Sequence, residues 1–152
     1  MFQKLLAAAA LVTLAGISAA QAPAPAAAAT GLPRTASPAG AKLYIVSPAD
    51  GATVKGPFTV VFGLAGMGIA PAGVQFENAG HHHLLIDTDL PKDVGMPLPA
   101  TDNIRHFGKG QTEATLTLPP GKHTLQLVLG DHMHIPFNPV VASPKITITV
   151  AP

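Results

Sequence analysis

Short runs of alternating apolar and polar residues, separated by proline and glycine, dominate the chain from Lys42 onward, and no stretch keeps a helical period for three turns. Because a period of two places successive side chains on opposite faces of a strand, this pattern predicts an all-β domain. The predicted strands are Lys42 to Ser47, Thr53 to Lys55, Phe58 to Leu64, His81 to Asp87, Glu113 to Leu118, Lys122 to Gly130 and Lys145 to Val150. About seven strands in about 110 residues are typical of an immunoglobulin-like Greek-key β-sandwich, and a small barrel is the alternative.

The alternation also predicts which side chains fill the core of this sandwich. The threonines at positions 115, 117, 147 and 149 are then expected to face water. The predicted core residues are Phe58, Val60, Phe62, Ala114, Leu116, Leu118, Leu125, Leu127, Leu129, Ile146, Ile148 and Val150.

The first 41 residues have a different composition. Residues 1–20 combine Lys4, an apolar run from Leu5 to Ile17 and a small-residue cleavage pattern, which we interpret as a secretory signal peptide cut after Ala20. An apolar run of about 13 residues is too short for a membrane anchor, which needs roughly 20. Residues 21–41 are rich in alanine and proline and are predicted to be a disordered linker, so the domain is expected to span residues 42–152. The protein is therefore expected to be exported, with no membrane span after signal cleavage.

Charge and cysteine content narrow the classes of function. Loss of Lys4 with the signal peptide leaves eight basic residues against eight acidic ones, which gives no reason to expect binding to nucleic acid or to an anionic membrane. The chain has no cysteine, so neither a disulfide nor a thiolate ligand can form. None of the few serines lies in a nucleophile elbow, and we expect a binding protein that is not an enzyme.

Histidines carry the strongest chemical signal in the sequence. His81 and His83, and likewise His132 and His134, are spaced two residues apart at the start of one predicted strand and the end of another. In a sandwich these two strands pair and run in opposite directions, so both histidine pairs should meet at one rim of the domain. Imidazole is the commonest protein ligand for metals, and several imidazoles around one point suit copper(II) or zinc. Met133 would add a thioether that favours copper(I).

The remaining histidines are assigned different roles. His106 joins the predicted site if the loop before it returns across the domain, and Asp131 could orient a ligand histidine. His82 alternates with Leu84 and Ile86 and is expected to be a packing residue. His123 should lie about 30 Å from the site, at the other end of its strand. There it is expected to bond back to the preceding turn, as the corner tyrosine of sandwich domains does.

Several motifs resemble a bacterial secreted family known as domain of unknown function 4399. The resemblance rests on residues 80–87 (GHHHLLID), 106–113 (HFGKGQTE), 118–127 (LPPGKHTLQL), 130–136 (GDHMHIP) and 145–150 (KITITV). It implies an exported bacterial domain and, by itself, no activity or cofactor. Members of that family often carry a further histidine after the proline that matches Pro136, where this chain has Phe137.

Together these observations predict a periplasmic metal-binding protein that binds copper, or alternatively zinc, and holds the ion or hands it to a partner protein. The candidate ligands are His81, His83, His106, His132, His134 and Met133. The alternative is a non-metal adhesion module that binds a protein or a glycan through the same rim. Convergence of the ligand nitrogens on one point would favour the metal, and splayed or separately buried rings would favour the module.

Overall fold

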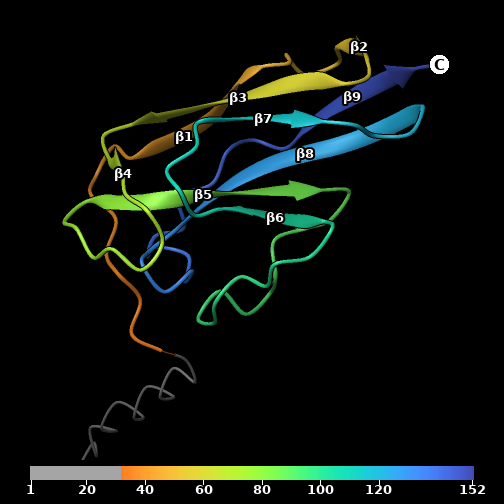
Figure 1. Cartoon of the computed structure of the whole chain (residues 1–152). Helices are drawn as coiled ribbons and strands as arrows, with labels where there is room; N and C mark the ends of the chain where they lie inside the picture. Colours follow the sequence, from red (N-terminus) through yellow and green to blue (C-terminus); the bar gives the residue numbers. More distant parts are fainter. Residues whose placement is uncertain (1–31) are drawn as a thin grey trace, which may run out of the picture.

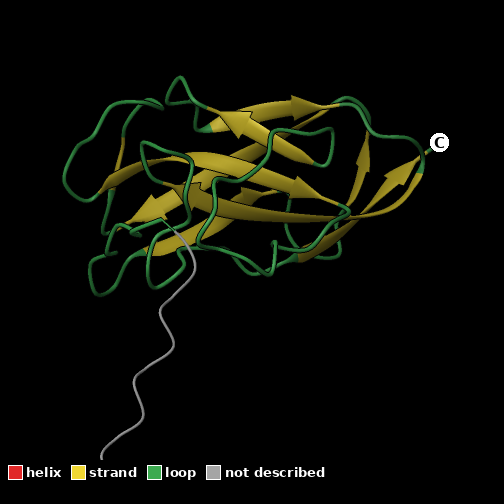
Figure 2. Ribbon diagram, turned by 90° about the horizontal axis from the view of Figure 1, so that it is seen from below, coloured by secondary structure: helices red, strands yellow, loops and turns green. Residues whose placement is uncertain are grey.

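The computed structural model describes residues 32–152, so the predicted signal peptide and residues 21–31 of the predicted linker lie outside the described residues. The described part is all-β, with strands and loops and no helix (Figure 2). Consequently no helix in this part could cross a membrane. The strands are β1 (Lys42–Ser47), β2 (Thr53–Lys55), β3 (Phe58–Ala65), β4 (Gly68–Ile69), β5 (Ala79–Ile86), β6 (Ile104–Phe107), β7 (Glu113–Leu116), β8 (Gly121–Gly130) and β9 (Ile146–Ala151).

The strands form two sheets, and all seven predicted strands are present with small differences at their ends (Figure 1). The smaller sheet has the order β1-β3-β7 and is antiparallel throughout. The larger sheet has the order β2-β9-β8-β5-β4, and β6 also pairs with β5. It is mixed, because β2 runs parallel to β9 and β4 runs parallel to β5. β4 and β6 are not predicted from the sequence, because they are only two and four residues long.

The main core lies between the two sheets and is built from the predicted residues. Ten of them are buried, whereas Ala114 and Leu118 are only partly buried. Leu84 and Ile86 of β5 face the same core. Thr115, Thr117 and Thr147 are exposed as predicted, and Thr149 is half-buried where it pairs with Thr53 of β2.

A second apolar cluster covers the outer face of the larger sheet. It contains Leu85 of β5, Val128 of β8, Ile104 of β6 and Leu98 of the loop between β5 and β6. All eight residues of β5 are therefore buried, since both faces of this strand are covered. The period-two pattern does not reveal such a cover, because the loops that provide it carry no alternation.

The start of the described chain packs against the loop between β8 and β9. Arg34 donates hydrogen bonds from its guanidinium group to the carbonyl groups of Pro136 and Phe137, and Thr35 donates one to Asp131. The backbone of Ala36 forms a parallel bridge with Asn138. The predicted disordered linker is thus too long at its C-terminal end, because polar side chains among the alanines and prolines find acceptors on this loop.

Candidate metal centre

Four of the six candidate ligands come together in one group. A ring nitrogen from each of His81, His83, His106 and His134 lies within 4.8 Å of the corresponding nitrogens of the other three. The ring centroids are between 4.7 and 5.9 Å apart, and most ring pairs are steeply tilted. We call these residues the four-histidine group. Such an arrangement could hold a metal ion.

Two of the four histidines come from β5. His81 and His83 lie on the face opposite to Leu84 and Ile86, so both rings reach the outer face of the larger sheet. Their residues are 0% and 1% exposed, respectively. The group therefore lies on a sheet face near the end of the domain, beneath covering loops. The prediction that it lies on the open rim is wrong.

The third histidine arrives on a strand that the sequence analysis missed. β6 pairs antiparallel with β5, and His106 lies directly opposite His83 in the register. The loop after Thr88 ends at the same end of β5, where the amide of Ile86 donates to the carbonyl of Asn103, so the loop itself does not carry His106 across the domain as predicted. β6 then runs back along β5 and brings His106 to the group by strand pairing. His106 is exposed, so this side of the group faces solvent.

The fourth histidine belongs to a tight turn after β8 (Figure 1, blue loop at the start of β5). The Asp131 amide donates to the Ile135 carbonyl at 2.9 Å, and the His134 amide donates to the Asp131 carbonyl at 2.9 Å. His134 has a φ of 67°, a left-handed conformation that a side chain other than glycine adopts only at a cost. This turn places Nδ1 of His134 3.1 Å from Nε2 of His81.

Two glycines provide space for the rings. A methyl group on Gly130 would approach Cε1 of His83 to 2.7 Å, and one on Gly108 would approach Cε1 of His106 to 2.3 Å. Any larger residue at either position would displace an imidazole from the group. The absence of a side chain at these positions is therefore part of how the four rings come together.

Burial and the neighbouring histidines keep the buried imidazoles neutral. Nδ1 of His81 and both ring nitrogens of His83 are buried without a hydrogen-bond partner among the described residues. Burial, followed by His134 and His106, lowers the pKa of His81 to about 4. Burial, followed by His81 and His106, lowers the pKa of His83 to about 3, and burial also lowers the pKa of His106. Neutral imidazoles with free lone pairs are the form that binds metal ions.

The other two candidate ligands lie outside the four-histidine group. His132 is half-buried and lines a separate hollow together with Thr35, Phe76 and Glu77. Met133 is 40% exposed. The turn explains this separation, because it brings the ring of His134, and not that of His132, to the face on which His81 lies. A spacing of two residues predicts a shared face in a strand, whereas this segment is not a strand.

Three further sequence predictions concern residues near the group. His82 is 1% exposed, and its ring packs against Phe62 at a centroid distance of 5.0 Å, which confirms the packing role. No histidine donates a hydrogen bond to Asp131 in the described part of the chain. The prediction that Asp131 orients a ligand histidine through such a bond is therefore wrong. Its carboxylate instead binds the amides of Met133 and Ile135 and the hydroxyl group of Thr35. Phe137, at the position of the further histidine, is buried in the core between the sheets.

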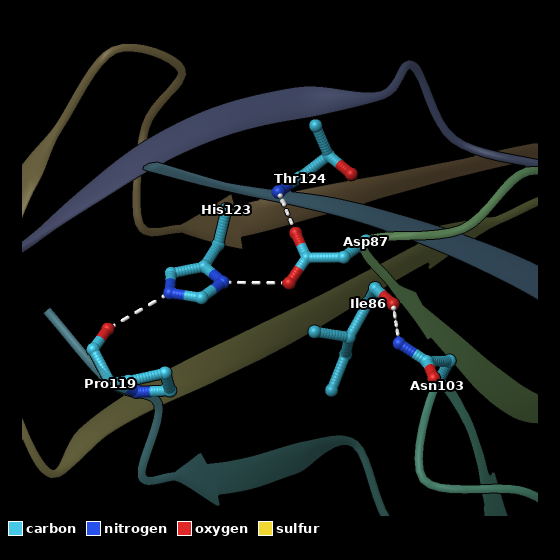
Figure 3. A network of polar contacts seen from close by, with 6 residues as sticks. All are labelled: Ile86, Asp87, Asn103, Pro119, His123 and Thr124. Atoms are coloured by element: carbon cyan, nitrogen blue, oxygen red, sulfur yellow. Dashed lines mark hydrogen bonds and ion pairs between the residues drawn. The ribbon is translucent and has the colours of Figure 1, made fainter. Parts of the chain in front are cut away.

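His123 lies at the other end of β8, away from the four-histidine group, and has the structural role expected of it (Figure 3). Its Nε2 lies 2.9 Å from the carbonyl oxygen of Pro119 in the preceding turn. Its Nδ1 lies 2.7 Å from the carboxylate of Asp87, which also accepts from the amide of Thr124. The hydrogen bond to Asp87 is the main reason why the pKa of His123 is raised.

Comparison with known proteins supports the family resemblance. No curated protein and no solved structure matches this chain. The model of the family described as domain of unknown function 4399 matches residues 60–151, which include every strand of the larger sheet except β2 and all four histidines of the group. The chain is therefore a member of the domain of unknown function 4399 family.

Proposed function

We propose that this protein is an exported metal-binding protein that holds one copper ion in the four-histidine group and passes it to a partner. The observation that carries the proposal is the convergence of four ring nitrogens, one from each histidine, within 4.8 Å. Buried polar atoms are normally satisfied, and His81 and His83 each leave ring nitrogens without a hydrogen-bond partner among the described residues, which favours a bound cation as the partner of the group. The signal-peptide pattern in residues 1–20 supports export to the periplasm.

The choice of copper follows from the chemistry of the donors. Four imidazoles suit copper or zinc, and copper(II) heads the affinity order for divalent ions at nitrogen sites. Two nitrogens bound to one ion in tetrahedral geometry lie about 3.4 Å apart, given bonds of about 2.0 to 2.1 Å. The separation of 3.1 Å between Nε2 of His81 and Nδ1 of His134 is close to this value, and the other nitrogens, which lie within 4.8 Å, would need to move inward.

Transfer to a partner is supported by the unequal burial of the ligands. His81 and His83 are buried, whereas His106 is exposed and borders a shallow hollow lined by residues 100–107. An incoming ligand would therefore meet the ion from the side of His106. No step in this role requires catalysis, and we propose a carrier that is not an enzyme.

The strand order supports an immunoglobulin-like fold as the scaffold of this site. β1, β3 and β7 would be strands A, B and E, and β5, β8 and β9 would be strands C, F and G. An experimental structure in which the two sheets close into a single barrel would contradict this assignment.

The test is calorimetric titration of the protein, expressed from its full-length sequence, with copper(II), with copper(I) under reducing conditions and with zinc(II). We expect binding at one ion per chain that is lost in a His83→Ala/His134→Ala double variant. His132→Ala and His123→Ala are matched controls and should bind like the wild type, because neither ring belongs to the group. The mass of the purified protein reports export, since cleavage after Ala20 leaves Gln21 at the N-terminus.

Two outcomes would reject these proposals. Absence of saturable binding, or equal loss in the His132 control, would remove the four-histidine site. Protein that keeps residues 1–20 and stays in the cytoplasm would remove export. In the first case the non-metal interaction module becomes the better account, with Phe76, which is 71% exposed beside the hollow that His132 lines, as the contact to test.

A further inference from the structure

Asp131 is a buried carboxylate without a cationic partner. The residue is 1% exposed. Among residues 32–152 the ion pairs join His123 to Asp87 and Lys145 to Asp89, and neither includes Asp131. Arg34, in the segment before β1, packs against the loop that contains Asp131 but donates to the carbonyl groups of Pro136 and Phe137. Buried charges in proteins are ordinarily paired or close to a metal ion, so this carboxylate calls for an explanation.

The hydrogen bonds of Asp131 favour its charged form. One carboxylate oxygen accepts from the amide of Met133 at 2.9 Å and from the amide of Ile135 at 3.0 Å. The other accepts from the hydroxyl group of Thr35 at 2.7 Å. Three donors and no acceptor surround the group, which stabilises a negative charge.

The carboxylate is held next to the four-histidine group. The amides that it binds belong to the residues on either side of His134, and Gly130, which precedes Asp131, lies opposite His81 in the sheet register. The four imidazoles themselves carry no charge with which to balance a bound cation.

We propose that Asp131 is the counter-charge of the metal ion, a positioning and affinity-determining residue that acts through its charge without coordinating the ion. This inference rests on the proposed function, since it assigns a role within the same site. It replaces the role expected from the sequence, in which the carboxylate orients a histidine through a hydrogen bond.

The competing explanation is that Asp131 only fastens the turn. Asp131→Asn separates the two, because its amide oxygen can still accept from both backbone amides and its amide nitrogen can donate to Thr35. The turn keeps its hydrogen bonds and loses one charge. Thr35→Val is the matched control, since it removes a hydrogen bond and keeps the charge. Glu113→Gln, at an exposed position on β7, controls for net charge.

The experiment is titration of each full-length variant with zinc(II), which has no redox chemistry, alongside urea unfolding of the metal-free protein. For Asp131→Asn we expect affinity to fall roughly 10- to 100-fold, the usual effect of changing a residue that supports a metal site from outside the ligand set. Unfolding of the metal-free variant should be unchanged or shifted to higher urea, because an uncompensated buried charge has been removed. Thr35→Val and Glu113→Gln should stay within about threefold of the wild-type affinity, because the charge beside the group remains.

The other possible results contradict either the counter-charge role of Asp131 or the metal site itself. Wild-type affinity in Asp131→Asn, or an equal loss in Thr35→Val, would overturn the counter-charge and leave the metal site standing. Wild-type protein that binds no zinc(II) and no copper would overturn both, together with the proposed function.

Discussion

Buried histidines lie in opposite chemical settings at the two ends of β5. His81 and His83 belong to the strand itself, whereas His123 lies on the neighbouring strand β8, beside the other end of β5. At the start of the strand, His81 and His83 meet other imidazoles, and three of their four ring nitrogens find no hydrogen-bond partner among the described residues. At the other end, His123 meets two oxygen atoms, one of Asp87 and one of Pro119 (Figure 3). The pKa values of His81 and His83 are lowered and that of His123 is raised. Burial is the main cause of the lowered pKa of His81 and His83, whereas at His123 the hydrogen bond to Asp87 outweighs burial.

The partners also decide what each histidine can do. A carbonyl oxygen and a carboxylate both accept hydrogen bonds, so His123 satisfies both only when both of its ring nitrogens carry a proton. Such an imidazolium has no lone pair for a metal and ties the turn before β8 to the end of β5. In the four-histidine group only His81 and His134 bond to each other, and the other nitrogens of His81 and His83 are buried without a partner among the described residues, which costs stability in the metal-free protein and favours a cation.

The largest expected difference between the two ends is in the stability of the metal-free protein. We expect His123→Ala to lower the free energy of unfolding by about 1 to 3 kcal/mol, because two hydrogen bonds from a charged imidazolium, one to a carboxylate and one to a carbonyl oxygen, are lost. His83→Leu replaces an unsatisfied buried imidazole by an apolar side chain of similar volume, and we expect a change within about 1 kcal/mol, toward higher stability. Urea unfolding in the presence of a chelator measures both.

Bound metal should reverse this order of stabilities. Unfolding in the presence of metal is therefore the control for the comparison between the two ends of β5. Bound ion should raise the stability of wild type and of His123→Ala, and should leave His83→Leu unchanged, since binding to the native state alone stabilises it. A His83→Leu variant that is strongly destabilised without metal would show that the ring is a packing residue like His82. That result would break the contrast between the two ends.

The sequence correctly predicts seven of the nine strands in the described residues, most of the core between the sheets and the role of His123, because each depends on local alternation or on a neighbouring turn. Leu125, Leu127 and Leu129 are buried as expected from a period of two. The cover on the outer face of the larger sheet could not be predicted, because Leu98 and the other residues that provide it lie in segments without periodicity.

The candidate site could be predicted in part for the same reason. His81 and His83 share a face because they belong to one strand, and strand pairing brings the end of β8 beside them. His134 replaces His132 at the site because its left-handed conformation, which spacing does not encode, reverses the chain in the turn. β6 cannot be predicted because its four residues are too few to show alternation. His106 is nevertheless predicted as a candidate ligand from its place in the chain.

The pH dependence of stability sharpens the comparison with a smaller effect, and the two ends act in opposite directions. His123 has a raised folded pKa, so its stabilisation is fully present below its ordinary value of 6.5 and is lost as pH rises through the folded value. His81 and His83 have folded pKa values of about 4 and about 3, so the unfolded chain takes up protons first as pH falls below 6.5. Stability is then lost between pH 6.5 and about 3.

Urea midpoints of the metal-free protein measured across the range from acid to mildly alkaline pH would resolve both effects. We expect His123→Ala to flatten the decline above pH 6.5 and His83→Leu to flatten the decline below it, each without altering the other limb. Bound metal should steepen the acid limb, because the ion requires neutral imidazoles and is released as they are protonated. An acid limb that His83→Leu leaves unchanged would mean that carboxylates, and not the four-histidine group, govern acid unfolding.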